Sequence, residues 1–286
     1  MAERAKKDSM HIQKLKLGLL LDSFNISAWE YSVIQHILNK DAGEFELVIL
    51  NEDASQSTQT KKNAGVYTIF NRIDEKIFTK TQDPFASKNS MELLATVPIL
   101  KVHPKQDGMG SFLGEEDINT LRGYRLDILI KFGFEDLQLE TLNISKYGIW
   151  FYYHGDDRIM RGGPPGFWEV VENWPETSSA LLSVGGKYSP KRVLFRSHFI
   201  TYPFSPARHR SSYFWATTSF LARQIDLLQR LGEERYYQET EKFNTALLPK
   251  IKKYELPSND LALKSISKLI IRQIKEFIQR VFYVNQ

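Results

Sequence analysis

Cysteine is absent from this 286-residue sequence. The protein therefore has no disulfide bond and no thiolate ligand for a metal, which fits a reducing compartment. No apolar run approaches the ~20 residues that a membrane-spanning helix needs. Residues 1–8 also lack the apolar core of a secretory signal. On these grounds we expect a cytoplasmic location.

Metal-binding patterns are missing as well: there is no His-Glu-x-x-His pair and no aspartate-rich calcium loop, so we expect no metal. The formal net charge is +4, which is too small to indicate a nucleic-acid partner by itself. Hydrophobic residues make up 42% of the chain and charged residues 25%, as is ordinary for a soluble globular protein. The aromatic content of 13% indicates a well-filled core or an aromatic pocket.

The first part of the chain alternates between strand and helix patterns. Residues 16–21 form a short, continuous apolar run typical of a buried parallel strand, and residues 45–50 form another. Between them, residues 28–38 have helical spacing, with Asn25 or Ser27 as the N-cap. This β-α-β order predicts a parallel sheet with a right-handed crossover.

Later segments continue in the same way and then become helical. Strands are predicted at residues 96–102, 127–132, 148–153, 179–184 and 192–200, and shorter helices at 115–121 and 165–173. Residues 66–70 fit either a short strand or the start of a helix, and residues 137–142 fit one helical turn. Longer helices are predicted at residues 212–232, 233–248 and 261–284. We therefore expect a flexible N-terminus (1–14), an α/β domain (15–206) and a helical C-terminal region (207–286).

His154 is the leading candidate for chemistry, because it ends the aromatic strand at 148–153 and precedes a charged turn. Such strand ends are where α/β enzymes place their reacting groups. A carboxylate beside an imidazole fixes its tautomer and raises its basicity, which makes Asp156 and Asp157 candidate partners. The alternatives are that both aspartates only cap the turn and that His154 is a buried histidine bound to a backbone carbonyl.

Three other features allow a binding role and a structural one. The Gly/Pro segment at 162–166 can form an anion-binding elbow or a rigid turn before a helix. His103 can line the same strand mouth or lie exposed. A basic cluster can bind an anionic substrate or form a solvated face; its members are Arg196, His198, Arg208, His209 and Arg210.

The last predicted helix carries a basic stripe beside apolar positions. The stripe consists of Lys264, Lys268, Arg272, Lys275 and Arg280. Such a helix can contact anionic lipid or nucleic acid. We favour a helix that docks on the core with its lysines in water, so that a membrane partner is not favoured and a nucleic-acid partner is not expected.

Four stretches together resemble the formyltransferase family, which includes methionyl-tRNA formyltransferase, glycinamide ribonucleotide formyltransferase and the sugar N-formyltransferases. They are residues 16–21, 97–104, 126–133 and 148–168, and their order and spacing cover residues 15–205. The resemblance implies a Rossmann-like, mostly parallel sheet of the formyltransferase type. It also implies transfer of a formyl group from formyl-tetrahydrofolate to an amine, such as a nucleotide-linked amino sugar.

Site roles follow from the resemblance. In the family, an asparagine and a histidine stabilise the oxyanion of a tetrahedral intermediate, and an aspartate pairs with the histidine. His154 matches this histidine, while Arg161 and Gly162 match an Arg-Gly pair that we expect, with Arg158, to bind substrate. Folate is expected beside two short segments, whose members are Val102, His103, Pro104, Phe132, Gly133 and Phe134.

Two positions depart from the family pattern. Tyr152 stands in place of the asparagine, and the stretch at 188–193 contains no acid, with Ser189 as its nearest match. Loss of an oxyanion donor costs about 10²–10³ in rate, unless the Tyr152 hydroxyl and Asp156 or Asp157 replace the missing groups. Tyr152 and His154 point to the same side of their strand. We favour the enzyme interpretation. The alternative is a catalytically inactive binding or partner module in glycan biosynthesis.

Overall fold

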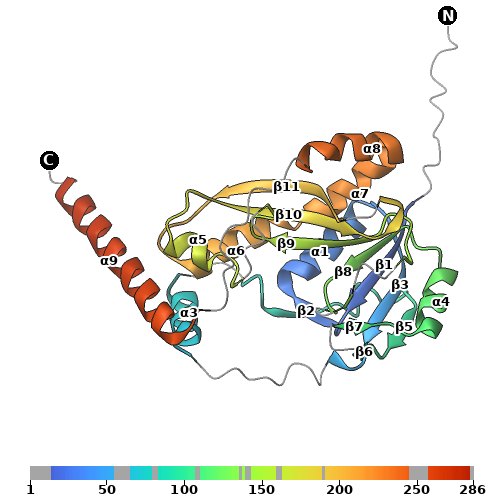
Figure 1. Ribbon diagram of the computed structural model, residues 1–286, viewed down its shortest axis with the longest axis horizontal. Coiled ribbons are helices and arrows are strands. Elements are labelled where there is room, and N and C mark those ends of the chain that lie inside the picture. The colour runs from blue at the N-terminus through green and yellow to red at the C-terminus, as the bar shows by residue number, and fades with distance from the viewer. Residues whose placement is uncertain are drawn as a thin grey trace, which may run out of the picture.

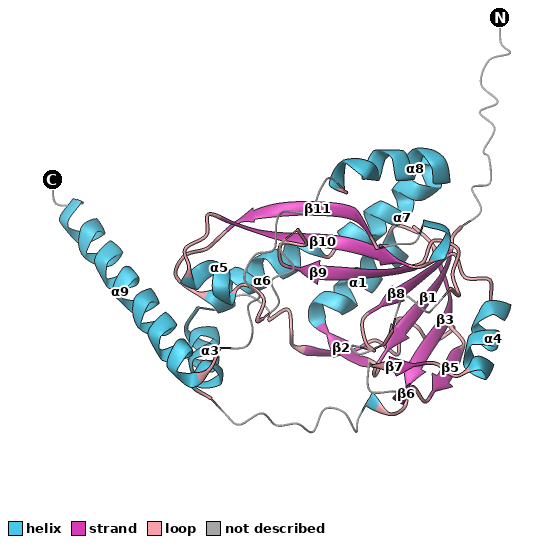
Figure 2. Cartoon of the chain, viewed as in Figure 1, coloured by secondary structure: helices cyan, strands magenta, loops and turns pink. Residues whose placement is uncertain are grey.

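The computed structural model describes residues 14–54, 65–78, 83–106, 110–134, 137–138, 143–158, 163–188, 191–244 and 257–283. Its centre is a seven-stranded sheet with the order β11-β10-β9-β8-β1-β3-β5 (Figures 1 and 2). The parallel strands are β1 (Lys16–Leu21), β3 (Glu44–Asn51), β5 (Ile99–Val102), β8 (Ile128–Lys131) and β9 (Ile149–His154). At one edge, β10 (Glu176–Val184) and β11 (Arg192–Ile200) run antiparallel to their neighbours. The predicted mostly parallel α/β sheet is therefore confirmed.

The central strand β1 shows why the apolar runs form this sheet. Leu17 and Leu19 pack into one hydrophobic core and Leu20 into another on the opposite face, as expected where successive side chains alternate. All three are fully buried, which explains the unbroken apolar sequence of a strand covered on both faces. Gly18 lies between them, where an added Cβ would come within 2.6 Å of a Leu126 methyl.

Helices cover the two faces of the sheet. The first core contains buried side chains of α1 (Ala28–Asn39), α6 (Pro206–Thr217), α7 (Phe220–Leu231) and α8 (Glu233–Thr240). The second contains Leu121 of α4 (Glu115–Gly123). The predicted cap at Ser27 is confirmed, since the Glu30 carboxylate accepts a 2.9 Å hydrogen bond from its backbone N–H. The first core thus joins residues from both sides of the expected 206/207 boundary, such as Leu19 and Ile225.

Smaller elements complete the arrangement. Two short antiparallel pairs lie beside the main sheet: β2 (Asn25–Ser27) with β4 (Ser87–Asn89), and β6 (Lys105–Gln106) with β7 (Ser111–Phe112). A five-residue helix, α5 (Phe167–Val171), follows the Gly/Pro segment, and two single turns of 3-10 helix occupy Gly186–Tyr188 and Glu241–Phe243. Residues 66–70, whose sequence fits either a short strand or the start of a helix, form the start of the helix α3 (Val66–Phe78). Of the turn predicted at 137–142, residues 139–142 fall outside the described part of the chain.

One predicted helix is divided in the structure. The pattern at residues 212–232 predicts a single helix, but α6 ends at Thr217 and α7 begins at Phe220. The hydroxyls of Thr217 and Thr218 donate to the carbonyls of Phe214 and Trp215 at 2.7 and 2.9 Å. Such side-chain bonds compete with helix continuation. The helix therefore breaks here, although the apolar spacing of the sequence continues.

The last helix, α9 (Asn259–Tyr283), reaches away from the body, and α3 lies against it (Figure 1). One side of this helix packs on α3 and α5, where Ala262, Ser265 and Leu269 are buried, and not on the two hydrophobic cores of the sheet. Its isoleucines on the other side are exposed. In the part of the chain that the structure describes, no helix is both long and apolar enough to cross a membrane.

Candidate functional site

The carboxyl ends of the parallel strands bring together residues from five separate segments. Asp22 follows β1, Asn51 ends β3, His103 follows β5, Phe132 follows β8 and His154 ends β9. Because these strands are neighbours in the sheet, the five positions lie side by side at the carboxyl ends of the strands, which we call the carboxyl edge of the sheet. Crevices at this end are where open α/β sheets bind ligands, and the predicted candidates His103, Phe132 and His154 lie there.

The imidazole of His154 is held by a serine. The antiparallel register between β9 and β10 sets Ser179 opposite His154, and its Oγ lies 3.0 Å from His154 Nδ1. Although the residue as a whole is only partly buried, its Nε2 atom is shielded from solvent and has no hydrogen-bond partner among the described residues. In this part of the chain the partner of the histidine is therefore a hydroxyl and not a carboxylate.

Aromatic rings enclose the same imidazole. Phe214 of α6 stacks on it with ring centroids 3.7 Å apart, and Trp29 of α1 meets it edge-on at 5.1 Å. Tyr152 and Tyr213 lie at 5.7 and 5.8 Å. We call these four rings the aromatic cage of His154. Trp29 is its centre, because its ring also contacts Tyr152 and Phe214 at 5.3 and 5.4 Å.

Burial in this cage lowers the pKa of His154 to about 3. The charged form is disfavoured because apolar rings replace water around the ring, so the imidazole is neutral at pH 7. Two tautomers fit the contacts, since the Ser179 hydroxyl can donate to Nδ1 or to the Tyr153 carbonyl at 3.4 Å. A group with this pKa is a weak general base at neutral pH, where effective bases have a pKa near the working pH.

Tyr152 uses its hydroxyl to join two helices. The hydroxyl donates to the Thr217 carbonyl at 3.1 Å and accepts from the Leu221 N–H at 3.2 Å. These are unpaired backbone groups at the end of α6 and the start of α7. Burial raises the pKa of Tyr152. Its one hydroxyl proton is already donated to backbone, so none remains for an oxyanion in this arrangement.

The two predicted carboxylates bind arginines. Asp156 accepts hydrogen bonds from the backbone N–H, Nε and one terminal nitrogen of Arg158 at 3.0, 2.9 and 2.7 Å. Burial raises the pKa of Asp156, but the Arg158 hydrogen bonds outweigh it, so the pKa lies below its usual value. Asp157 forms a bidentate ion pair with Arg196, whose Nε and one terminal nitrogen donate to its two oxygens at 2.6 and 2.5 Å. Only 4% of the Asp157 side chain and 10% of the Arg196 side chain are exposed.

Of the three residues predicted to bind substrate, Arg158 alone lies in the described part of the chain. Arg158 is paired with Asp156, and Arg161 and Gly162 lie outside the described residues, as does Ser189. In the basic cluster, Arg196 binds Asp157 and Arg210 binds Glu75 at 2.6 Å.

His209 from the same cluster has a structural position. Its Nε2 lies 2.7 Å from the Thr177 hydroxyl, and its Nδ1 accepts from the Tyr202 N–H at 3.2 Å. Since Nδ1 is the acceptor, Nε2 carries the proton of the neutral ring. Burial lowers the pKa of His209 to about 4. The pairing of these side chains within the fold leaves less free positive charge than the sequence pattern indicates.

The expected folate segments contain both packed and exposed residues. Val102 is buried and Pro104 partly buried, whereas the His103 side chain is 65% exposed and lies 3.2 Å from Asp53. The Asp53 hydrogen bond raises the pKa of His103. Phe132 packs edge-on against Trp29 at 5.7 Å.

Gly133 and Phe134 are fitted against a residue that the sequence reasoning did not select. The Asp22 carboxylate accepts from the Phe134 N–H at 3.0 Å and from the Asn51 amide at 3.1 Å. An added Cβ at Gly133 would come within 2.6 Å of the Asp22 backbone nitrogen. The available signal was an acid placed directly after the first buried strand. Ser179 and the cage residues gave no comparable signal, since strand register and helix docking bring them to His154.

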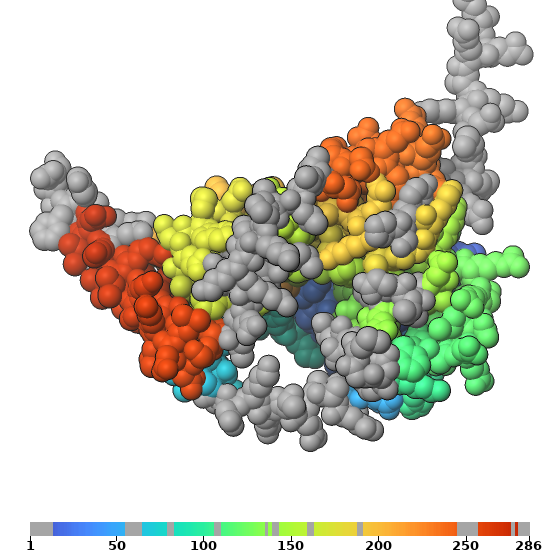
Figure 3. All heavy atoms as spheres, in the orientation of Figure 1, coloured from blue at the N-terminus to red at the C-terminus, as the bar shows by residue number. Residues whose placement is uncertain are grey.

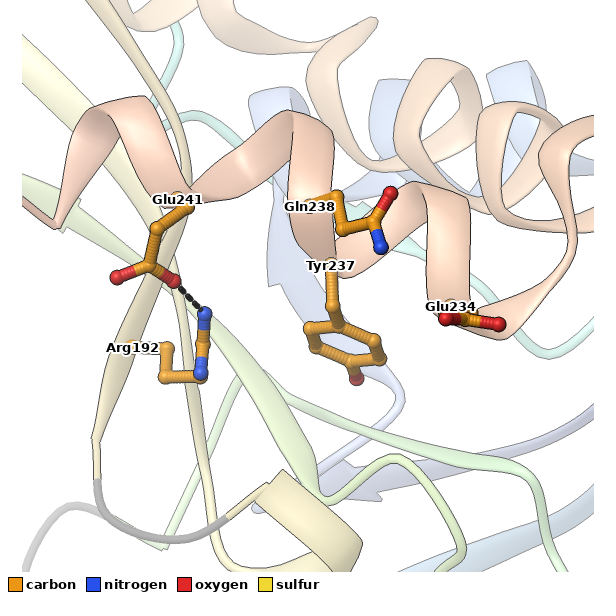
Figure 4. Close-up of a pocket in the computed structure, with 5 residues that line it drawn as sticks. All are labelled: Arg192, Glu234, Tyr237, Gln238 and Glu241. Atoms are coloured by element: carbon orange, nitrogen blue, oxygen red, sulfur yellow. Dashed lines mark hydrogen bonds and ion pairs between the residues drawn. The ribbon is translucent and has the colours of Figure 1, made fainter.

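A separate cavity of about 490 Å³ lies between β11 and α8 and contains none of the predicted site residues. Arg192 binds Glu241 at its wall (Figure 4), and the Arg192 guanidinium lies 5.6 Å from the centre of the Tyr237 ring. Glu234 and Gln238 complete the lining. Over the described ranges, no group of three histidine and carboxylate side chains is arranged to hold a metal ion.

Comparisons with known proteins give a likeness in backbone only. No protein-family model matches the chain, and no curated protein sequence matches it. Among solved structures, the chain is similar to the phosphoribosylglycinamide formyltransferase of Anaplasma phagocytophilum, with 13% identity, a TM-score of 0.48 and coverage of 76% of this chain and 88% of that one.

Two further solved structures have the same kind of likeness. Glycinamide ribonucleotide transformylase 1 from Symbiobacterium toebii has 11% identity and a TM-score of 0.49, with coverage of 76% of this chain and 88% of that one. A sugar N-formyltransferase from a Shewanella species has 11% identity and a TM-score of 0.44, with coverage of 84% and 76%. At these values the likeness identifies neither a substrate nor an activity.

Proposed function

We propose that this chain is a formyltransferase-like binding module that holds a small molecule at the carboxyl edge of its sheet and does not transfer a formyl group through His154. One observation carries the proposal: the His154 imidazole is enclosed by aromatic rings and bound to Ser179. The family resemblance of the four sequence stretches supports the formyltransferase-like part.

The chemistry of the described corner supports the absence of transfer. Acyl transfer to an amine needs a group that accepts a proton and donors that stabilise the developing oxyanion. His154 has a pKa of about 3, and the Tyr152 hydroxyl is bonded to the backbone of two helices. The carboxylates of Asp156 and Asp157 are bonded to arginines. Neither role thus has a prepared side chain among these described residues.

The class of ligand follows from the polar rim of the same edge. Asp22 is exposed and accepts from the Asn51 amide, while Asp53 is partly exposed and its carboxylate lies 3.2 Å from His103 Nδ1. Carboxylates at a sheet edge bind ammonium and hydroxyl groups through charge-assisted hydrogen bonds. We therefore propose an amine-bearing, hydroxyl-rich small molecule, such as an amino sugar, with a role in glycan biosynthesis.

Formyl transfer from formyl-tetrahydrofolate to such an amine is the second candidate. The observation that favours it is the Nε2 atom of His154, which is buried without a partner among the described residues and would become a hydrogen-bond donor for an oxyanion if the cage opened. Folate would lie against residues 102–104 and 132–134. In the described arrangement the residues do not fit its transferring end, because Trp29 and Phe214 cover the imidazole.

The experiment is calorimetric titration with amino sugars and with a formyl-folate analogue, together with a formylation assay on the wild type and on His154→Ala. His198→Ala is the matched control, since His198 is an exposed histidine on β11. We expect an amino sugar to bind in all three proteins and no formylated product in any.

Product formation that His154→Ala reduces by about 10²-fold or more, with His198→Ala unchanged, would overturn the proposal in favour of the second candidate. Absence of amino-sugar binding at millimolar concentration would overturn the ligand assignment.

A further inference from the structure

Helices α3 and α9 expose two rows of large aliphatic side chains on one side of the molecule. Ile69, Ile73 and Ile77 recur at every fourth position of α3, and Leu263, Ile270 and Ile274 form a row on α9. These six side chains are between 46% and 59% exposed. Figure 3 shows α9 at one end of the molecule with part of α3 beside it. We call these six residues the aliphatic face.

The two rows form one surface and not two. A groove of about 420 Å³ runs between the helices, and it is lined by the α3 row and by Leu263 and Ile270 of the α9 row, with Ile274 one turn further along α9. Its lining also contains Phe70, Phe78, Ile266 and Leu269. Soluble proteins rarely leave a contiguous apolar patch of this kind without an interaction that covers it.

Polar contacts fix the orientation in which α9 presents this face. The Arg272 guanidinium donates to the carbonyls of Val170 and Pro203 at 2.6 and 2.5 Å. At the start of the helix, the Asn259 side chain accepts from the Val66 N–H at 3.0 Å. With Ala262 and Leu269 buried against the body, the helix cannot rotate its isoleucines inward without breaking these bonds.

Basic side chains border the aliphatic face. On α9, Lys264, Lys268 and Lys275 form an exposed row next to the aliphatic row, because Lys264 and Lys275 directly follow Leu263 and Ile274. On α3, Arg72 and Lys76 are exposed between the isoleucines. None of these five cations forms an ion pair with any residue the structure describes. Asp260, at the start of α9, is an exposed acid, and the side chain of Glu276 is outside the described part of the helix.

We propose that the aliphatic face and its lysine border are a docking surface for an anionic lipid membrane, on which the protein lies without crossing. An apolar row beside a row of lysines is the pattern by which interfacial helices insert between lipid headgroups. The lysine stems extend along the apolar layer while their ammonium groups reach lipid phosphates.

Charge complementarity decides against a second copy of this chain as the occupant. Two-fold pairing of the aliphatic face would bring two basic borders toward each other, since a symmetric dimer uses the same patch on both subunits. Like charges at such a distance repel, whereas an anionic surface attracts each lysine. The inference concerns a surface that shares no residue with the His154 corner, so it stands whether or not the proposed function does.

Flotation of the full chain with phosphatidylcholine vesicles, with and without phosphatidylserine, tests the proposal at physiological salt. We expect flotation with the phosphatidylserine vesicles only. Lys264→Gln, Lys268→Gln and Lys275→Gln should each weaken partitioning about fivefold, the worth of one basic side chain near an anionic surface. Ile270→Ser with Ile274→Ser should weaken it about tenfold or more through lost apolar burial.

Matched controls replace residues of the same kind elsewhere on the surface. The exposed lysines Lys40, Lys105 and Lys242 are changed to Gln together, and the exposed Leu38 of α1 is changed to Ser; neither should alter partitioning. Circular dichroism confirms that every variant is folded.

Absence of flotation at physiological salt, or flotation that the isoleucine pair does not weaken, would overturn the proposal. A dimer in light scattering that the isoleucine pair converts to monomer, without flotation of the wild type, would assign the face to self-association.

Discussion

His154 Nδ1 and Ser179 Oγ lie 3.0 Å apart across the β9–β10 pair. A carboxylate at this position would hold the imidazole charged or strongly basic, whereas a hydroxyl leaves it neutral. The sheet register therefore supplies the histidine with a partner that supports position but not proton transfer. The aromatic cage completes this state by excluding water from Nε2.

Removal of the Ser179 hydroxyl should destabilise the fold. Ser179→Ala leaves a buried nitrogen of His154 unpaired, and the expected loss is about 1–3 kcal/mol in the free energy of unfolding. Urea unfolding measures it. Ser212→Ala removes an exposed hydroxyl that bonds its own helix at 2.9 Å and should stay close to wild type. An equal loss in both variants would contradict the special position of Ser179.

Acid should destabilise the protein through the buried His209 and through His154, whose Nε2 atom is shielded from solvent. The pKa is lowered to about 3 in His154 and to about 4 in His209, while both titrate near 6.5 when unfolded. Below pH 6.5 the unfolded chain therefore binds more protons than the folded protein. The contribution of the two neutral histidines to the free energy of unfolding is complete above pH 6.5, and it is lost as the pH falls toward their pKa values in the folded protein.

At pH 5 each of these histidines should lower the free energy of unfolding by about 2 kcal/mol relative to pH 7. Urea unfolding at both pH values is the measurement. His154→Gln and His209→Gln should each reduce the difference between the two pH values. A pH dependence equal to that of the wild type in both variants would contradict the assigned burial.

The Tyr152 hydroxyl should matter for the junction between α6 and α7. Tyr152→Phe keeps the ring in the cage but removes the bonds to Thr217 and Leu221, with an expected loss of about 1–3 kcal/mol. Thermal unfolding followed by circular dichroism measures it. Tyr202→Phe removes an exposed hydroxyl and is the control. A Tyr152→Phe variant as stable as the wild type would show that the helix junction does not depend on this hydroxyl.

The Asp157–Arg196 pair should be far more sensitive than an exposed pair. Asp157→Asn leaves the Arg196 charge buried and should cost about 3–5 kcal/mol, as measured by urea unfolding. Asp226→Asn breaks an exposed helical pair with Arg230 and should cost under about 1 kcal/mol. The double replacement Asp157→Leu with Arg196→Met should recover much of the loss, because no unpaired charge remains. A double variant as unstable as Asp157→Asn would contradict this explanation.

The centre of the sheet was predictable because its strands are buried on both faces, and the apolar run at 16–21 matches β1 in both bounds. The segment at 192–200 also matches β11, although this strand is largely half-buried. The break between α6 and α7 was not predictable from spacing, since the apolar period continues through Thr218 and only the contact with Tyr152 from a distant strand shows where the helix divides.

The candidate site was predictable in position but not in chemistry. A histidine at the end of an aromatic strand placed His154 at the correct edge of the sheet. The cage depends on how α1 and α6 dock, and the Ser179 contact depends on antiparallel register. Neither has a local sequence signal. The same holds for α9, whose period predicts an amphipathic helix but not which apolar positions the body covers.

The most direct test of the central claim is proton NMR titration of the His154 ring between pH 5 and 8, with its signal assigned by its loss in His154→Gln. The expected result is a chemical shift that does not change over this range, because the enclosed imidazole stays neutral down to a pKa of about 3. A titration midpoint between pH 6 and 8 would contradict the account, since it would show an imidazole that is open to water or paired with a carboxylate and available for proton transfer.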